Sequence, residues 1–163
     1  MVDIRKVKEE DKPQVRTLEL FCIREYLENS LQKRWDDLPA ELMEQLGAST
    51  KDSFDFYREA GLSYVAMEKG QVVGFLFSQM MQHVNNIEKV LWIENIGVHP
   101  EHRRKGVGLK LLRRAALDGK KKGAKAVQSV IMPDSKDAVM LHKKVGFFLD
   151  GRKFAFLDLE NFS

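Results

Sequence analysis

The stretch LWIENIGVHPEHRRKGVGLKLL, from Leu91 to Leu112, decides the fold of this chain. Its first half alternates apolar side chains as a strand does, and its end repeats leucine at helical spacing. Between the two halves lies a short basic turn with two glycines, Gly106 and Gly108. A strand that runs through such a turn into a helix brings free N–H groups and the positive end of the helix dipole to one point. The stretch therefore predicts a phosphate-binding turn.

The spacing of the glycines narrows the choice of ligand. The dinucleotide fingerprint G-x-G-x-x-G would need a third glycine where Leu111 stands, and the Walker pattern G-x-x-x-x-G-K-[ST] is absent. What is present is Arg103-x-x-Gly106-x-Gly108, between an apolar strand and a leucine-periodic helix. In this context the pattern resembles the [QR]-x-x-G-x-[GA] signature of the GCN5-related N-acetyltransferase (GNAT) family, which cradles the pyrophosphate of coenzyme A.

The resemblance implies acetyl-CoA as cosubstrate and names the residues that would hold it. The pyrophosphate would lie on the turn formed by Arg103, Arg104, Lys105, Gly106, Val107, Gly108 and Leu109. In the family a bulge makes this strand splay from the next parallel strand, and the pantetheine arm lies between the two. By resemblance it would bind the backbone of Ile96, Gly97 and Val98. A glycine inside a strand suits a bulge or a close backbone approach, although Gly97 could also simply accommodate a bulky neighbour.

Acetyl transfer to an amine needs a group that takes the proton of the amine, because a free alkylamine is charged at neutral pH. Glu94 is the candidate base. It is a carboxylate in an otherwise apolar strand, it shares strand parity with Val98, and family members carry a carboxylate here. The alternative is that Glu94 faces solvent or pairs with a lysine.

The departing thiolate benefits from an acid, and here the sequence departs from the family pattern. The family pattern N-x-x-A-x-x-[LF]-Y-x-x-x-G-F is matched by Ser135, Ala138, Leu141, His142, Gly146 and Phe147. His142 stands where a tyrosine would protonate the thiolate, and Ser135 stands where an asparagine would touch the cofactor. An imidazolium can donate a proton, so His142 is the candidate acid, although it could also only pack against the cofactor. These departures keep a second function open, a GNAT-fold module that binds or senses acyl-CoA without catalysis.

Composition and length predict one GNAT-like acetyltransferase domain over residues 1–163. The absence of a signal segment and of a long apolar run, with one cysteine, predicts a cytoplasmic protein with no membrane partner. Cys22 is expected to be a packed thiol in a helix. Because no cysteine is expected near the site, the amine would attack the thioester directly.

Charge is unevenly distributed along the chain, although the net charge is only +3. Residues 100–125 carry ten Lys or Arg against two acids, whereas residues 20–60 carry nine acids against five Lys or Arg. The basic block suits an anionic cofactor, and the acidic block suits a cationic amine acceptor such as a polyamine, an aminoglycoside or a lysine side chain. Solvated helix surfaces would explain either block, and small-molecule and protein acceptors stay equally open.

Two other kinds of ligand are not predicted. No aromatic residue is interleaved with the basic residues between Pro100 and Gly146, so nucleic acid is not an expected partner. His99-x-x-His102 has a spacing that can bind metal on a helix, but Pro100 puts it in a turn and no third ligand is nearby. No metal is therefore expected.

Patterning along the chain predicts an α/β (α+β) fold, a mixed and mostly antiparallel sheet with helices on both faces and a splayed central parallel pair. The expected strands are 1–8, 62–68, 71–84, 89–98, 124–132, 147–149 and 153–159. The expected helices begin at Asp11 and Pro13, cover 40–60 in one or two pieces, and span 106–122 and 136–144. The strand 124–132 has no charge after Lys125 and is expected to be buried on both faces. The last two strands would form a hairpin whose Phe154, Phe156 and Leu159 could pair across a homodimer.

Overall fold

The computed structural model describes residues 1–42, 51–132, 134–155, 157, 159–160 and 162. These residues divide into two compact units, Met1–Ser129 and Val130–Ser163, which are described in turn. Whether the whole chain behaves as one domain stays a prediction. Among the described residues no helix has the length and apolar character needed to cross a bilayer.

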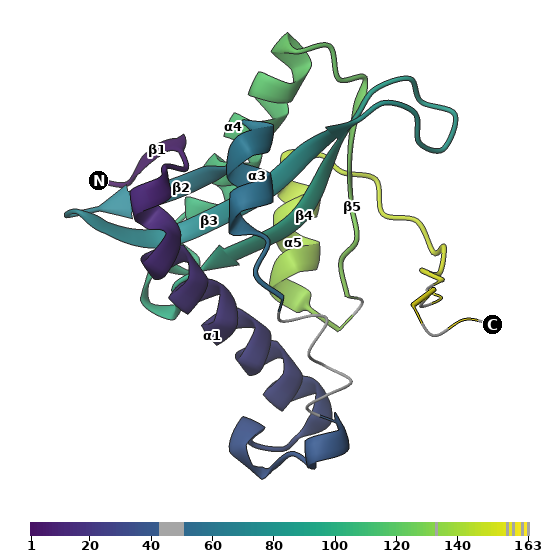
Figure 1. Cartoon of the computed structure of the whole chain (residues 1–163). Helices are drawn as coiled ribbons and strands as arrows, with labels where there is room; N and C mark the ends of the chain where they lie inside the picture. Colours follow the sequence, from purple (N-terminus) through teal and green to yellow (C-terminus); the bar gives the residue numbers. More distant parts are fainter. Residues whose placement is uncertain (43–50, 133, 156, 158, 161, 163) are drawn as a thin grey trace. The chain divides into compact units, whose positions relative to one another are not determined.

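The first unit is built on a five-stranded sheet whose spatial order follows the sequence (Figure 1). The strands are β1 (Asp3–Lys6), β2 (Tyr64–Glu68), β3 (Gln71–Met81), β4 (Val90–Val98) and β5 (Ala126–Ser129). All neighbours are antiparallel except β4 and β5, which are parallel. The predicted mixed and mostly antiparallel sheet is therefore confirmed.

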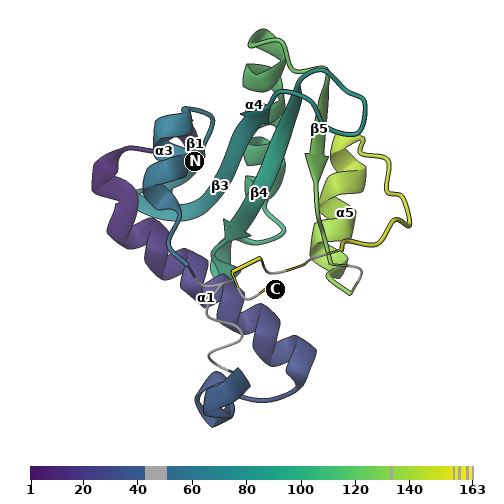
Figure 2. The ribbon, with the colours of Figure 1, turned by 45° about the vertical axis from the view of Figure 1, so that its right-hand side comes forward.

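Helices cover both faces of this sheet, as predicted (Figures 1 and 2). The elements on one face are α1 (Lys12–Leu31) and α3 (Phe54–Ala60), and α4 (Val107–Lys121) lies on the other. Short 3₁₀ turns occur at η1 (Glu9–Asp11), η2 (Trp35–Asp37) and η4 (Pro100–His102), and residues 40–42 are helical. The second piece of the predicted helix 40–60 is thus α3, and residues 43–50 lie outside the described residues.

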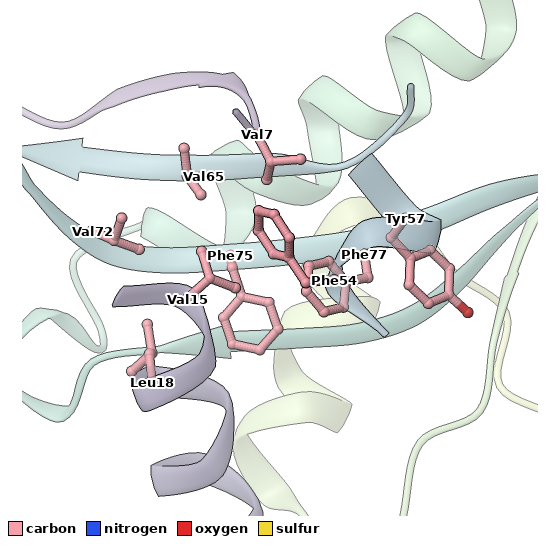
Figure 3. Close-up of a cluster of buried hydrophobic side chains, with 9 residues drawn as sticks. All are labelled: Val7, Val15, Leu18, Phe54, Tyr57, Val65, Val72, Phe75 and Phe77. Atoms are coloured by element: carbon pink, nitrogen blue, oxygen red, sulfur yellow. The ribbon is translucent and has the colours of Figure 1, made fainter. Parts of the chain in front are cut away.

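The core on the α1 and α3 face explains why these helices lie where they do (Figure 3). It is a cluster of buried side chains from both helices, from β2 and β3, and from the residue just after β1: Val7, Val15, Leu18, Phe54, Tyr57, Val65, Val72, Phe75 and Phe77. The opposite face packs against the apolar side of α4, including Val107, Leu111, Leu112 and Ala115. The side chains of β3 thus divide between the two helical layers, and their alternation shifts by one residue at Val73, which is an extra residue opposite β2.

The second unit contains α5 (Lys136–Val145), which ends where Gly146 adopts a left-handed φ of 112°. The predicted C-terminal hairpin is wrong for the described residues, since none of residues 147–155 is in a strand. Phe148 and Phe154 are 88% and 70% exposed, so the apolar side chains of the expected hairpin cover nothing there. A two-stranded hairpin without a buried face is marginal in water, which accounts for the difference. Phe156 lies outside the described residues.

The strand predicted over residues 124–132 is shorter than expected and is not buried on both faces. β5 has four residues, and all of them are half-buried. The reason is its position, because β5 is the last strand in the order of the described sheet and has a partner on one side only. An uncharged sequence therefore did not distinguish an edge strand from a central one.

Candidate active site

The parallel pair of β4 and β5 separates halfway along β4. β5 pairs with Val90–Ile93 through residues 126–129, and β4 then continues alone on that side to Val98 (Figure 2). Within the described residues, no strand pairs with the backbone edge of 94–98 that would face β5. The splayed pair predicted from the family resemblance is confirmed, and Ile96, Gly97 and Val98 lie on the separated part.

The irregularity that shapes this strand is at Glu94, not at Gly97. On β3, Phe77 pairs with Asn95 and the next residue, Ser78, pairs with Ile93, so that Glu94 is one extra residue on β4. A bulge of this kind alters the alternation of side chains beyond it. Glu94 therefore shares the α1 and α3 face with Asn95, and the expectation that it shares parity with Val98 is wrong.

Glu94 is exposed, and two aromatic side chains lie beside its carboxylate. Trp92 Nε1 donates to Glu94 Oε2 at 2.7 Å from the same face of the strand. The Tyr57 hydroxyl on α3 lies near Glu94 and Gln79. Burial and the charge of Glu94 together raise the pKa of Tyr57, so its hydroxyl stays protonated and can donate. None of the ion pairs among the described residues involves Glu94, so the alternative of a lysine partner is not supported.

Gly97 leaves no room for a side chain. A Cβ there would lie 2.5 Å from Phe75 Cε1 and 3.1 Å from Cys22 Sγ. The bulky-neighbour explanation of this glycine therefore holds on one side of the strand. The prediction that no cysteine lies near the site is wrong, because Cys22 of α1 packs beside β4. Burial raises the pKa of its thiol despite the nearby Arg103, which makes it a poor nucleophile.

The turn after β4 has the geometry expected of an anion-binding site. Arg104 and Gly106 both have positive φ, 60° and 81°, and α4 begins at the next residue. The first intrahelical bond here runs from Lys110 N to Gly106 O. The N–H groups of residues 107–109 therefore precede the ladder of α4 and open toward the turn. Arg104, Lys105 and Gly106 are exposed, as a ligand site requires.

Arg103 is turned back into the protein. Its Nε donates to the carbonyl of Val98 at 2.9 Å, and its NH1 nitrogen forms an ion pair with Glu25 of α1 at 2.7 Å. The side chain thus ties the end of β4 to α1. The predicted role of Arg103 in binding a phosphate stays a prediction.

Sequence reasoning missed a buried carboxyl on α1. Glu19 is 5% exposed, pairs with Arg16 at 2.6 Å and lies near Asn95. Burial raises its pKa despite the arginine. Its place beside the bulge depends on how α1 packs, and no local signal reveals that. The contact of Trp92 with Glu94 could have been predicted from the sequence, because residues two apart in a strand share a face.

The two remaining site candidates belong to the second unit. Ser135 is the N-cap of α5, and its carbonyl accepts from Val139 N at 3.0 Å. His142 is 1% exposed, and its Nδ1 lies 2.7 Å from the carbonyl of Ala138. A carbonyl can only accept, so Nδ1 carries a proton. Nε2 is buried without a partner among the described residues. The roles of Ser135 and His142 stay predictions from the sequence.

The histidines before the turn are used within the protein. His102 Nε2 lies 2.6 Å from Glu68 Oε2, and this bond lowers the pKa of Glu68. His99 Nδ1 accepts from Glu101 N at 3.2 Å. In the described part of the chain, no group of three or more His, Cys, Asp or Glu residues could hold a metal ion.

Comparison with known proteins gives one family and one curated relative. The family described as "Protein of unknown function (DUF1999)" matches residues 2–162. An uncharacterized N-acetyltransferase of Methanocaldococcus jannaschii is 33% identical over 86 residues, which are 52% of this chain. The match spans 38% of the length of that relative.

Solved structures with the same fold cover nearly the whole chain. The aminoglycoside N-acetyltransferase AAC(6')-Iy, in complex with a bisubstrate analog of CoA and acetylneamine, has a TM-score of 0.70 at 21% identity over 97% of this chain and 98% of its own. An acetyltransferase from Trypanosoma brucei has a TM-score of 0.66 at 21% identity, with coverage of 98% and 100%. A transcriptional regulator from Bacillus halodurans C-125 has a TM-score of 0.69 at 21% identity, with coverage of 96% and 100%. The resemblance to the GNAT family is thus confirmed at the level of the fold.

Proposed function

Because the chain belongs to the DUF1999 family and has the GNAT fold, we propose that it is an acetyl-CoA-dependent N-acetyltransferase. The observation that carries the proposal is the course of β4. This strand leaves β5, presents a backbone edge that no strand of the described residues covers, and leads through η4 into the basic turn before α4. The acetyltransferases with this fold include one in complex with a CoA-linked bisubstrate analog.

In the proposed complex the turn and the free edge of β4 bind different parts of acetyl-CoA. The N–H groups of residues 107–109 and the dipole of α4 would hold the pyrophosphate, with Arg104 and Lys105 supplying positive charge. The pantetheine arm would pair with the backbone of residues 96–98 as an added strand does. This orientation would place the thioester near the bulge, where the backbone could polarise its carbonyl.

Catalysis in this proposal begins with removal of a proton from the amine. Glu94 is an exposed carboxylate on the bulge and would take that proton directly or through a water. The neutral amine then attacks the thioester carbon, the C–N bond forms and the C–S bond breaks. The proton that the nitrogen loses in forming the amide goes to the departing thiolate, so that CoA leaves as the thiol. Cys22 takes no part as an acyl carrier, because a thiol with a raised pKa is a weak nucleophile.

We propose a cationic amine as the acceptor, since Glu94 would attract it without a competing ion pair in the described residues. Some acids of residues 20–60 are already used, for example Glu25 with Arg103 and Asp55 with Lys12. The acidic block therefore attracts the acceptor less than its net charge suggests. Aminoglycosides, the acceptors named for several proteins of the same fold, belong to this chemical class.

The test begins with a calorimetric titration of the protein with acetyl-CoA, followed by thiol release with a panel of amines. We expect a Kd in the micromolar range, which is a free energy of about −8 kcal/mol. Gly108→Glu should abolish binding because it puts a carboxylate at the positive end of α4. Leu117→Glu is the matched control, since this residue is 59% exposed near the other end of α4.

Three outcomes of this test distinguish the enzyme from the acyl-CoA sensor. Binding that is lost in Gly108→Glu, together with thiol release, supports the enzyme. Binding without release from any amine supports the alternative, an acyl-CoA sensor, which the replacement of the family asparagine and tyrosine by Ser135 and His142 favours. A parent protein that does not bind acetyl-CoA contradicts both.

A further inference from the structure

We infer that Glu25 of α1 and Arg103 are positioning residues that fix the cofactor turn, residues 103–109, to the rest of the first unit. The inference rests on the proposed function, in which this turn holds the pyrophosphate of acetyl-CoA. It assigns a role to a carboxylate that the sequence identified only as one member of an acidic block.

Arg103 joins the end of β4 to the beginning of the cofactor turn. It follows η4 directly, and its backbone N–H donates to the carbonyl of Pro100 at 3.3 Å. Its Nε donates to the carbonyl of Val98, the last residue of β4, at 2.9 Å. The guanidinium therefore lies at the point where the chain leaves the strand for the turn.

Glu25 holds this guanidinium from α1. Its Oε1 lies 2.7 Å from the NH1 nitrogen of Arg103, and the two side chains are 34% and 30% exposed. A guanidinium presents its donors in one rigid plane, so partners on two elements fix its orientation as well as its position. The ion pair thus links α1 to the carbonyl of Val98 through Arg103.

The packing of α1 against β4 places Glu25 at this point. A Cβ at Gly97 would lie 3.1 Å from Cys22 Sγ, so the helix meets the strand closely just before Val98. Cys22 and Glu25 are three residues apart and therefore lie on the same side of the helix. The carboxylate is thus brought to the end of β4 by a contact that a side chain at Gly97 would disturb.

The next two cations of the cofactor turn are not used in this way. In the part of the chain that the structure describes, no ion pair involves Arg104 or Lys105, and both residues are exposed. They can meet a phosphate, whereas Arg103 would first have to leave Glu25. This difference favours a positioning role for Arg103 over direct contact with the phosphate.

The turn needs such support because of its backbone conformation. Arg104 has a φ of 60°, in the left-handed region that residues other than glycine seldom adopt. A conformation of this kind persists where the neighbouring residues fix it, and Arg103 is the neighbour on one side. Ordering the turn before the ligand arrives removes a cost of binding. The pair of Glu25 and Arg103 should therefore raise the affinity for acetyl-CoA without touching it.

The test compares Glu25→Ala with Glu28→Ala in a calorimetric titration with acetyl-CoA. Both variants remove a carboxylate of α1 that accepts a hydrogen bond, but Glu28 accepts it from Trp35 N in η2, at 2.8 Å. We expect Glu25→Ala to raise the Kd on the order of tenfold, because the turn is no longer ordered in advance, and Glu28→Ala to leave it unchanged.

The sign of the effect separates positioning from its alternatives. Charge alone predicts tighter binding in Glu25→Ala, since the variant loses a negative charge beside an anionic cofactor. Direct contact also predicts tighter binding, because Arg103 would be released to the phosphate. A Kd of Glu25→Ala that equals or falls below the parent value overturns the inference, as does an equal loss of affinity in Glu28→Ala.

A double variant tests whether the two residues act as a unit. Arg103→Lys keeps the positive charge, but one ammonium group cannot replace two donors on different atoms. Its Kd should rise about as much as that of Glu25→Ala, and combining the two changes should add little. Losses that add would mean that the residues contribute independently, which contradicts the inference.

Hydrogen exchange without cofactor separates this inference from the proposed function. The amides of Arg103 and Lys110 are bonded at the two ends of the turn, and NMR should show them exchanging faster in Glu25→Ala than in the parent. Unchanged exchange in β2 would check that the variant is folded. Equal exchange of the turn in both proteins overturns the inference. A parent protein that does not bind acetyl-CoA contradicts the proposed function, and the exchange still decides whether the pair orders the turn.

Discussion

Two tyrosine–carboxylate pairs lie on opposite faces of the sheet, and they are completed differently. On the α4 face, the buried Tyr64 donates to Asp118 Oδ2 at 2.8 Å, and Arg114 Nε donates to the same oxygen at 2.9 Å. The Arg114 guanidinium also lies over the Tyr64 ring, 5.5 Å from its centroid. This carboxylate is therefore matched by a cation and has no charge to offer a ligand.

On the other face, Tyr57 and Trp92 approach Glu94, and no ion pair completes the group within the described residues. Glu94 is exposed, whereas the side chain of Asp118 is 18% exposed. A carboxylate with donors but no counter-charge is oriented and still able to take a proton or attract a cation. A carboxylate that pairs with both a tyrosine and a cation, as Asp118 does, thus stabilises the fold. A carboxylate without a cation, as at Glu94, keeps its charge available for a ligand.

Replacing each carboxylate by its amide should give the largest difference in turnover between the two sites. Glu94→Gln should lower kcat on the order of a hundredfold at neutral pH with the Kd for acetyl-CoA unchanged, because the loss of a general base affects the chemical step. Asp118→Asn should leave kcat per folded molecule unchanged. Steady-state thiol release and calorimetry check both. Equal turnover of Glu94→Gln and the parent would remove Glu94 from the mechanism.

The free energy of unfolding should respond in the opposite order, with the larger change at Asp118. Asp118→Asn should lower the free energy of unfolding by about 1–3 kcal/mol at neutral pH, because it removes hydrogen bonds to a charged group. Glu94→Gln should change it little. Burial of the Asp118 carboxyl raises its pKa, but the hydrogen bonds from Arg114 and Tyr64 outweigh burial and lower that pKa. The stabilisation is therefore present above the pKa of the unfolded chain, about 3.9, and is lost as pH falls through the lower folded value. Thermal unfolding of parent and variant should converge in strong acid, and a constant gap would contradict this.

The smallest effect is expected at Glu19, whose pKa is shifted in the other direction. Burial raises it, so the folded protein binds a proton that the unfolded chain has already lost, and stability falls as pH rises through this window. Glu19→Gln should remove that cost and raise Tm slightly at neutral pH, with the difference vanishing below about pH 4. Scanning calorimetry over a pH series checks this. A variant with a lower Tm than the parent at neutral pH would show that the pair with Arg16 outweighs burial.

Features that depend on neighbouring residues could be predicted from the sequence, whereas features that depend on packing between elements could not. The strand, the turn and the start of α4 were predictable, because apolar alternation, Gly106 and leucine spacing act within one stretch. The position of Glu94 was not, since a bulge depends on the register with β3 and reverses the parity inferred from counting. Tyr57, Glu19 and Cys22 reach the site through the packing of α3 and α1, which no local pattern encodes. The C-terminal hairpin, which the described residues do not form, shows the same limit, because a strand needs a partner and a buried face as well as β propensity.

The order of the strands also bears on how the first unit forms. Strands β2, β3 and β4 are joined by short connections and pair as a meander, which requires little loop closure. β1 must close a loop of some length to reach β2, and β5 must wait for the crossover through α4. We therefore expect the meander that carries the bulge to form early, and the two outer strands to dock later. The strand that holds the candidate base would then be in register before the groove for the cofactor exists.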